Sequence, residues 1–429
     1  MRTILAILLL VAFTGCSAMA QERIAVNEAG MLTIRTPGKG EMPCSLFVHH
    51  DDWVWRGAEQ LRRPAENRWS GVIAKREEDG PGSISFVQTV ERVARGVRVE
   101  YEFTRQGEMD LRQGVILAVV FPYPDYRGRQ IVFTHGPPAD TDRNFRAAAR
   151  GCTVNLSETE ALQIEFGQAT RFTTWISEDR SFSLNVRLAP RDMGDAAKAV
   201  LTLRLVPAVR EVRPWVARPQ RAPLTLAGVT ADRQVVGLYE PVEFTLELSA
   251  TYENPFDPEQ VAVDATVTTP SGRTERVPGF YCQGFEAEYE NGEELLSLDG
   301  EPTWKVRYTP REVGAYSVAF EARDGSGRAA SPPLSFRCAQ SGAGGFARLS
   351  SAQDSAPIYF RLDNGESLFL IGHNVTGYPI NVDEVFRRMA AGGENYTRFW
   401  MHSGAFGLEW ALPVGHYREQ RAWQLDRTL

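Results

Sequence analysis

Three tryptophans near the start of the chain, Trp53, Trp55 and Trp69, are the side chains whose type and spacing could bind a ligand. An indole presents a flat apolar face and one N–H donor, so an exposed indole can form a platform for a sugar ring. Tryptophan is also highly buried on average, and the same residues could instead belong to a hydrophobic core. Both interpretations stay open on the sequence alone.

Histidine and cysteine positions do not predict a metal site. His373 and His402 are far apart in the sequence, and no carboxylate is clearly joined to them. Beyond the N-terminal segment no two cysteines have CxxC spacing and none has a histidine close by, which disfavours structural zinc. We therefore expect no metal and no cofactor.

Disulfide pairing is left open. The chain beyond its first 20 residues contains Cys44, Cys152, Cys282 and Cys338. An even number of cysteines in an oxidising compartment can form disulfides. A pair between Cys282 and Cys338 is one hypothesis, because both fall in the same expected domain. Four separate, small apolar side chains are the other.

The N-terminus has the features of an export signal. Arg2 precedes an apolar run from Ile4 to Phe13, and Ala18-Met19-Ala20 is a small-x-small cleavage pattern. Residues 1–20 are therefore expected to be a signal peptide. The segment ending at Cys16 also resembles a bacterial lipobox, in which Cys16 would carry a lipid. We expect an exported protein, either secreted, periplasmic or an outer-membrane lipoprotein, with that lipid as its only membrane attachment.

Composition excludes several classes of protein. The chain has 429 residues, of which 43% are hydrophobic and 24% charged, and its net charge is −7. Nucleic-acid binding depends on clustered Lys and Arg that neutralise phosphates, so a nucleic-acid partner is not expected. Beyond the N-terminus no apolar run is long enough for a polytopic membrane protein.

The first expected domain, residues 21–220, has the pattern of a large β-sandwich. Short alternating runs rich in Val, Ile, Phe and Thr are separated by Gly, Pro and Asp clusters, and residues 84–90, 97–103 and 181–186 are examples. Such alternation is typical of antiparallel strands with one buried face. Prolines spaced between Pro207 and Pro223 predict a connector to the next domain.

The second expected domain, residues 221–340, has the size of an immunoglobulin-like sandwich. Its characteristic motifs are Tyr252–Asp257, Pro270–Arg273, Val277–Tyr281, Trp304–Pro310 and Gly314–Tyr316. With these motifs in this order, the segment resembles the Ig-like domain of unknown function, family 5060, which typically precedes a glycoside hydrolase barrel. The motifs also have structural roles, since Trp304 and Tyr316 would be core aromatics.

The third segment, residues 341–429, changes character after a Gly-rich linker. Residues 360–365 suggest a hairpin and 367–372 an apolar strand, and 382–389 have helical spacing with acidic residues in the first turn. Residues 396–401 predict a second strand. A strand, a helix and a strand form the βαβ unit that opens a parallel α/β fold. The expected fold class is therefore mostly β and multidomain: a large β-sandwich, an Ig-like β-sandwich, and an incomplete (β/α)8 barrel start.

Residues 369–374, 390–400 and 422–426 resemble the first βαβα segment of a glycoside hydrolase barrel related to family 5. The resemblance implies that Arg398, at the end of the second barrel strand, supports a nucleophilic carboxylate, which a guanidinium can hold bidentately. Residues just beyond barrel strands face the active-site mouth. This places four candidate substrate-binding residues there: His373, Asn374, Trp400 and His402, with Trp410 as a further candidate for stacking.

No catalytic carboxylate is expected in the chain. The resemblance implies an acid/base and a nucleophile from the fourth and seventh barrel strands, and too few residues remain for those strands. Glu394, Glu409 and Asp426 do not fall at suitable positions. We expect a fragment of an exported hydrolase that acts on O-glycosidic bonds of a polysaccharide or oligosaccharide, with exposed apolar strand faces. The alternatives are a non-catalytic surface carbohydrate-binding or adhesion protein, and a structural spacer.

Overall fold

The computed structural model describes residues 23–50, 53–74, 82–122, 125–141, 145–176, 181–210, 222–349, 360–375, 377–378, 381–409 and 417–429. The chain divides into two compact units. Unit 1 comprises Met1–Pro214 and Ala287–Ser297, and unit 2 comprises Trp215–Glu286 and Leu298–Leu429. The predicted signal peptide, Cys16 included, lies outside the described residues, and the predicted domain boundaries stay predictions.

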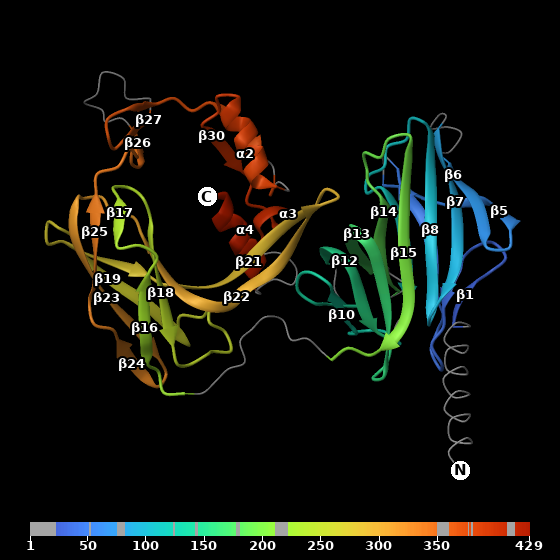
Figure 1. Cartoon of the computed structure of the whole chain (residues 1–429), viewed down its shortest axis with the longest axis horizontal. Coiled ribbons are helices and arrows are strands. Elements are labelled where there is room, and N and C mark those ends of the chain that lie inside the picture. Colours follow the sequence, from blue (N-terminus) through green and yellow to red (C-terminus); the bar gives the residue numbers. More distant parts are fainter. Residues whose placement is uncertain are drawn as a thin grey trace, which may run out of the picture. The chain divides into compact units, whose positions relative to one another are not determined.

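Unit 1 is built on a 15-stranded antiparallel sheet. Its strands are β1 (Ile24–Val26), β2 (Leu32–Ile34), β3 (Met42–His49), β4 (Trp55–Gly57), β5 (Glu59–Ala65), β6 (Arg68–Ala74), β7 (Gly82–Val93), β8 (Gly96–Gly107), β9 (Val115–Phe121), β10 (Gln130–Phe133), β11 (Ala139–Asp140), β12 (Arg146–Asn155), β13 (Glu160–Ile176), β14 (Phe182–Ala189) and β15 (Ala196–Pro207). The main path runs β1-β2-β3-β9-β14-β13-β15-β8-β7-β6-β5. Figure 1 shows β13, β15, β8 and β7 side by side in this order.

The core of unit 1 lies on one face of this curled sheet. Strands β7, β8 and β14 correspond to the three predicted examples. Buried residues alternate with more exposed ones along β7 and β8, whereas β14 is buried at most of its positions. Phe86, Tyr101, Phe103 and Phe182 are among the buried side chains that fill the core. The mostly β prediction is therefore confirmed, because the alternating apolar residues fall on one face of the strands.

A buried carboxylate joins three segments within unit 1. Glu293 is only 4% exposed, and it accepts hydrogen bonds from the guanidinium groups of Arg171 on β13 and Arg187 on β14. The Arg171 Nη2 to Glu293 Oε1 distance is 2.9 Å. Glu288, in contrast, pairs with Arg150 while its side chain is 62% exposed. A buried charge needs such partners, because desolvation would otherwise be unfavourable.

Unit 2 begins with a two-sheet sandwich. Its strands are β16 (Leu226–Ala231), β17 (Val235–Gly237), β18 (Val242–Leu248), β19 (Val261–Thr268), β20 (Thr274–Pro278), β21 (Phe280–Glu290), β22 (Glu293–Tyr308), β23 (Gly314–Asp324), β24 (Gly327–Ala330) and β25 (Leu334–Ala339). One sheet has the order β16-β18-β22-β21, and the other has β17-β25-β23-β19-β20, with β24 beside β23. The adjoining ends of β21 and β22, within Ala287–Ser297, belong to unit 1.

The sandwich core confirms the predicted roles of two aromatic residues. Trp304 is 6% exposed and Tyr316 is 2% exposed, and both belong to the cluster that includes Phe336. The Tyr316 hydroxyl donates to the backbone carbonyl of Glu312 at 3.0 Å, which satisfies its polar end.

The predicted disulfide between Cys282 and Cys338 is not formed. Cys282 lies on β21 and Cys338 on β25, which belong to different sheets of the sandwich, and both are free thiols. Cys44 and Cys152 are free and buried as well. Burial in apolar surroundings raises the pKa of the Cys44 thiol to about 12. The alternative interpretation, of separate small apolar side chains, therefore describes the cysteines.

The C-terminal part of unit 2 contains β26 (Ala347–Leu349), β27 (Phe360–Leu362), β28 (Ser367–Leu368), β29 (Gly372–Val375), α2 (Val382–Ala391), β30 (Tyr396–Phe399), α3 (Ser403–Phe406) and α4 (Glu419–Thr428). Strands β29 and β30 are parallel and α2 connects them, so the predicted βαβ unit is present. The strand predicted at 367–372 was wrong in its bounds, because β28 ends at Leu368 and β29 begins at Gly372. No (β/α)8 barrel is formed in the part of the chain that the structure describes.

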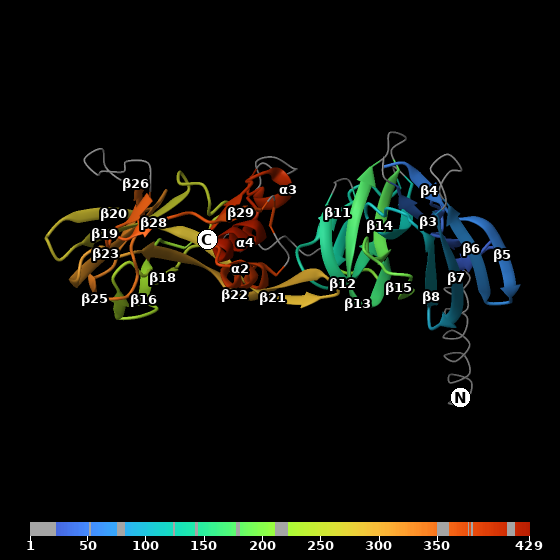
Figure 2. The same ribbon diagram turned by 90° about the horizontal axis from the view of Figure 1, so that it is seen from above.

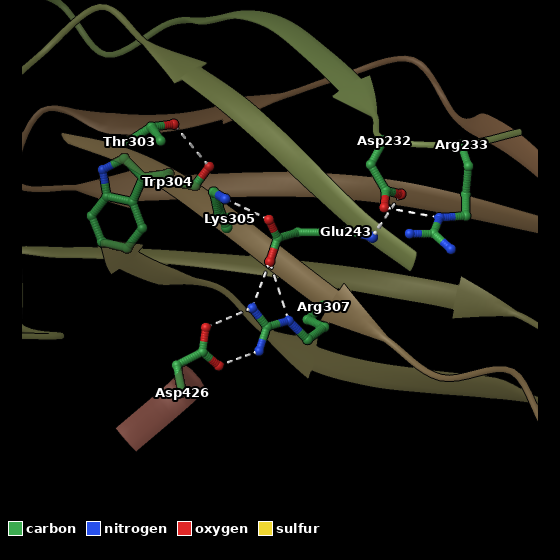
Figure 3. Close-up of polar contacts among 8 residues, drawn as sticks. All are labelled: Asp232, Arg233, Glu243, Thr303, Trp304, Lys305, Arg307 and Asp426. Atoms are coloured by element: carbon green, nitrogen blue, oxygen red, sulfur yellow. Dashed lines mark hydrogen bonds and ion pairs between the residues drawn. The ribbon is translucent and has the colours of Figure 1, made fainter. Parts of the chain in front are cut away.

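Helix α4 packs against the sandwich sheet that contains β21 and β22, and Figures 1 and 2 both show α4 beside β21. The Phe285 and Trp423 ring centroids lie 5.9 Å apart. The guanidinium of Arg307 on β22 donates to both Asp426 and Glu243, with Arg307 Nη1 2.5 Å from Asp426 Oδ1 (Figure 3). Asp426 is therefore held in a structural ion pair.

Glu419, in the first turn of α4, is expected to make the stability of unit 2 depend on pH. Burial raises the pKa of this carboxyl from 4.5 to about 7, although the helix N-terminus favours the charged form. A raised folded-state pKa gives stability that is fully present below 4.5 and is lost as the pH rises through about 7. We expect thermal unfolding to show lower stability at pH 8 than at pH 5, and Glu419→Gln to remove this contribution. An unchanged pH profile in Glu419→Gln, with the exposed Glu366→Gln as control, would contradict the prediction.

Among the described residues, no helix is long and apolar enough to cross a membrane.

Candidate functional site

The three tryptophans singled out by the sequence do not share one environment. Trp53 is 58% exposed and Trp55 is 55% exposed, whereas Trp69 is 5% exposed. Trp69 lies on β6, where its burial alternates with that of its neighbours, and its indole N–H donates to the Glu28 carbonyl at 3.1 Å. Trp53 and Trp55 therefore remain candidates for a sugar-binding platform, whereas Trp69 is a core residue.

Trp55 lies on the outer face of the unit 1 sheet, opposite the core. On β3, Met42, Cys44, Leu46 and Val48 belong to the main core, so alternation directs Phe47 and His49 to the other face. Trp55 is the register partner of His49. The rings of Phe47 and Trp55 are tilted by 33° with their centroids 6.0 Å apart.

Gly57 gives the Trp55 indole its position. Gly57 pairs with Phe47 and faces the same side of the sheet as Trp55. A Cβ atom built on Gly57 would lie 2.3 Å from Trp55 Cη2 and 2.9 Å from Cζ2. The benzene part of the indole therefore lies directly over the Gly57 backbone. Any side chain at position 57 would displace the indole.

The backbone at Trp53 is in an unfavourable conformation. Its φ is 65°, in the left-handed region that residues other than Gly, Asn and Asp rarely adopt. Its N–H donates to the His50 carbonyl at 2.8 Å, and His50 N–H donates to the Val54 carbonyl at 3.0 Å, so a turn enforces this conformation. Strain of this kind is concentrated at functional sites. A tryptophan with a strained backbone and an exposed side chain does not contribute to stability in the way that a core tryptophan does.

Two replacements of Trp53, by glycine and by alanine, are expected to differ in stability. Glycine adopts a positive φ without a Cβ clash, so Trp53→Gly should be more stable than Trp53→Ala by about 1 kcal/mol. Both variants lack the indole, so a difference in stability between them reports on the backbone at position 53 alone. Denaturant unfolding measures this difference. Equal stability of the two variants would mean that the backbone at position 53 is not strained.

His49 adds an uncharged polar ring beside these aromatic side chains. Its centroid lies 5.8 Å from that of Trp53 and 5.1 Å from that of Phe47. Partial burial lowers the pKa of the His49 imidazole below its usual value of 6.5. The ring is therefore neutral at pH 7. We call Phe47, His49, Trp53, Trp55 and Gly57 the tryptophan surface.

Trp175 provides an internal reference for this surface. It is 65% exposed and pairs with Ser183 on β14, on the outer face of the same sheet. Strands β3, β9 and β14 separate β4 from β13, which places Trp175 about 20 Å away across the strands. Trp175 is an exposed tryptophan like Trp55, but it lies on another strand, away from Phe47, His49 and Gly57.

The candidate residues of the C-terminal segment are only partly brought together. Asn374 on β29 and Arg398 on β30 are register partners in the parallel pair, so they lie side by side on one face. His373 lies on the opposite face by strand alternation. Trp400 and His402 follow β30 and are exposed. Trp410 lies outside the described residues.

Glu394, a carboxylate of this segment, is paired with a histidine. His373 Nδ1 lies 2.7 Å from Glu394 Oε2. No carboxylate partner of Arg398 is described, so its predicted supporting role stays a prediction, as do the substrate-binding roles of His373, Asn374, Trp400 and His402.

The apolar faces around β29 and β30 are uncovered, as the sequence led us to expect. The exposed large side chains are Phe369, Ile371, Tyr396, Trp400 and Met401. They are between 40% and 66% exposed. Parallel strands are normally buried on both faces, so this exposure is unusual for such a pair.

Within the described ranges, no group of three or more His, Cys, Asp or Glu side chains is arranged to hold a metal ion.

Sequence reasoning missed the residues that organise the tryptophan surface. A single glycine at position 57 does not indicate a contact with Trp55, and the residue type of Trp53 does not indicate its positive φ. The Trp-x-Trp spacing of residues 53 and 55 was a usable signal, because it marks the entry to β4. The alternating pattern of residues 68–74 could have predicted that Trp69, unlike Trp53 and Trp55, is buried.

Comparisons with known proteins identify one part of the chain. Residues 235–323 match the family model described as "Domain of unknown function (DUF5060)". This match confirms the predicted resemblance of the Ig-like sandwich. No curated protein matches the chain.

Solved structures show only weak likeness. A putative aldose 1-epimerase from Escherichia coli K12 is 14% identical, covering 42% of this chain and 77% of that one, with a TM-score of 0.27. A GH36 α-galactosidase from Geobacillus stearothermophilus is 11% identical, covering 41% of this chain and 32% of that one, with a TM-score of 0.25. The N-terminal domain of a Streptococcus gordonii adhesin is 8% identical, covering 74% of this chain and 93% of that one, with a TM-score of 0.14. At these TM-scores the likenesses carry no argument about function, and the chain is similar to the DUF5060 family over residues 235–323.

Proposed function

We propose that the chain is part of an exported glycoside hydrolase that acts on the O-glycosidic bonds of a polysaccharide, and that unit 1 binds that polysaccharide through the tryptophan surface. The observation that carries the binding role is the pair of exposed indoles at Trp53 and Trp55. Sugar rings have apolar C–H faces, and an indole held flat over a sheet offers the matching surface.

Three further features support carbohydrate as the ligand. The strained backbone at Trp53 is hard to explain by stability, since the indole is exposed rather than packed in the core. The buried Phe47 ring packs beside the Trp55 indole and the uncharged His49 ring lies beside that of Trp53, so neither adds charge to the surface. The DUF5060 resemblance of unit 2 implies a module that typically accompanies glycoside hydrolases.

The hydrolase assignment rests on the resemblance of the C-terminal segment. The parallel βαβ unit supports it, since such a unit opens a barrel, and so does the position of Arg398 near the end of β30. Export and a possible lipid at Cys16 are part of this proposal and follow from the N-terminal sequence alone.

A non-catalytic surface carbohydrate-binding or adhesion protein is the second candidate. It is favoured by the described carboxylates, because Glu394 is paired with His373 and Asp426 with Arg307. Release of reducing sugar by the chain from a polysaccharide it binds would exclude this candidate. Tight binding without any release would favour it.

The binding role is tested by affinity measurements on the full chain. We would use xylan, glucomannan, cellulose, pectin, agarose and alginate, and compare the unmodified chain with the double variant Trp53→Ala/Trp55→Ala. The proposal expects binding to at least one of these polysaccharides and its loss in the double variant. Leu349→Ala removes another exposed apolar side chain and should bind normally. Absence of binding to every polysaccharide, or full binding by the double variant, would overturn the proposal.

A further inference from the structure

A cavity opens beside Trp55 in unit 1. Its volume is about 160 Å³, and its walls combine residues of the main core, among them Cys44, Leu46 and Tyr101, with Trp55, Gly57 and Leu61. Trp55 and Gly57 therefore belong both to the tryptophan surface and to this cavity. Met31, Trp55 and Leu61 are the exposed large apolar side chains of this lining, so the cavity is reached from the side on which the Trp55 indole lies.

The lining of the cavity is uncharged. None of the described residues around it carries a charge, and most contribute apolar atoms. Two lining side chains already donate a hydrogen bond to the backbone. Gln88 Nε2 donates to the Gly30 carbonyl at 2.8 Å, and Trp69 Nε1 donates to the Glu28 carbonyl. The hydroxyls of Ser45 and Tyr101 are the other polar side-chain groups in the lining. They are too few to pair with an unsubstituted sugar, which has a hydroxyl on nearly every carbon and would bury unpaired polar groups here.

The size of the cavity suits a small apolar group. Cavities of roughly 150 Å³ with apolar walls can hold a molecule such as benzene. A short ester substituent is smaller than this, and its methyl group needs no hydrogen-bond partner.

We propose that this cavity receives an acetyl group carried by the sugar chain that stacks on Trp55, so that the protein recognises acetylated polysaccharide. The inference rests on the proposed carbohydrate-binding function of the tryptophan surface. The cavity would let the protein distinguish acetylated from unsubstituted sugar chains, which stacking on the indole alone would not do.

The test compares three forms of the polysaccharide that binds in the affinity panel. These are the untreated form, the form after mild alkaline de-esterification, and a partially acetylated form. Burial of one methyl group predicts that acetylation strengthens binding by roughly three- to tenfold. Equal affinity for the acetylated and de-esterified forms would overturn the inference while leaving the proposed function intact.

Two variants locate the effect in the cavity. Leu61→Phe and Met31→Phe each enlarge a lining side chain that is partly exposed, at 38% and 40%, so the fold should tolerate them. Both variants should lose the preference for the acetylated form and keep their affinity for the de-esterified form. Trp55→Ala should weaken binding of both forms. A preference unchanged in both Phe variants would overturn the inference alone, whereas absence of binding across the whole affinity panel would overturn the proposed function.

Discussion

Trp55→Ala is expected to weaken polysaccharide binding by about tenfold or more, with little change in thermal stability. Loss of an indole stacking surface removes about 1–2 kcal/mol of interaction, and about 1.4 kcal/mol corresponds to a factor of ten in affinity. Stability should change little, because the Trp55 side chain is 55% exposed and outside the main core. Isothermal titration with a short oligosaccharide of the binding polysaccharide measures the first quantity.

Gly57→Ala tests the geometry without removing the indole. A Cβ atom at position 57 would lie 2.3 Å from Trp55 Cη2, so the ring must move. We expect this variant to lose affinity as well. Trp175→Ala is the matched control, since it removes an equally exposed indole from the same face of the sheet. Loss of binding in Trp175→Ala, with normal binding in Trp55→Ala, would contradict the assignment of the surface.

Glu293→Ala is expected to destabilise unit 1 by about 3 kcal/mol, because it leaves Arg171 and Arg187 without their shared carboxylate in a partly buried site. The Arg187 side chain is only 12% exposed, and this burial lowers the pKa of its guanidinium. For a unit of this size, the change corresponds to a fall of about 6–12 °C in the thermal midpoint.

Glu288→Ala is the control for this prediction. Glu288 comes from the same short segment, but its ion pair with Arg150 is exposed. Exposed pairs contribute about 0–1 kcal/mol, so this variant should unfold close to the unmodified protein. Similar midpoints for Glu293→Ala and Glu288→Ala would show that the buried pairing contributes no more than an exposed one.

Local patterns predicted the secondary structure of the chain well. The acidic first turn at Asp383 and Glu384, and the glycines that follow Ala391, correctly predicted α2. Alternation correctly predicted β7 and β8. These signals work because hydrophobic periodicity and helix capping act between residues that are close in sequence.

Contacts between distant segments were not predictable in the same way. The packing of α4 depends on Phe285 and Arg307, which precede the helix by more than a hundred residues. Cys282 and Cys338 were placed in one domain, but the sequence did not indicate that they belong to different sheets. For the same reason the exposure of Trp55 was undetermined, since it depends on how Gly57 and Phe47 pair across strands.

The most direct test of the account is ¹⁹F NMR of the full chain labelled with 5-fluorotryptophan, titrated with a short oligosaccharide of the binding polysaccharide. The nine tryptophan signals are assigned by single Trp→Phe variants. The account predicts that the signals of Trp53 and Trp55 shift, while those of Trp175, Trp304 and Trp400 do not. Shifts confined to Trp400, or to Trp175, would contradict it and would place the carbohydrate site elsewhere on the molecule.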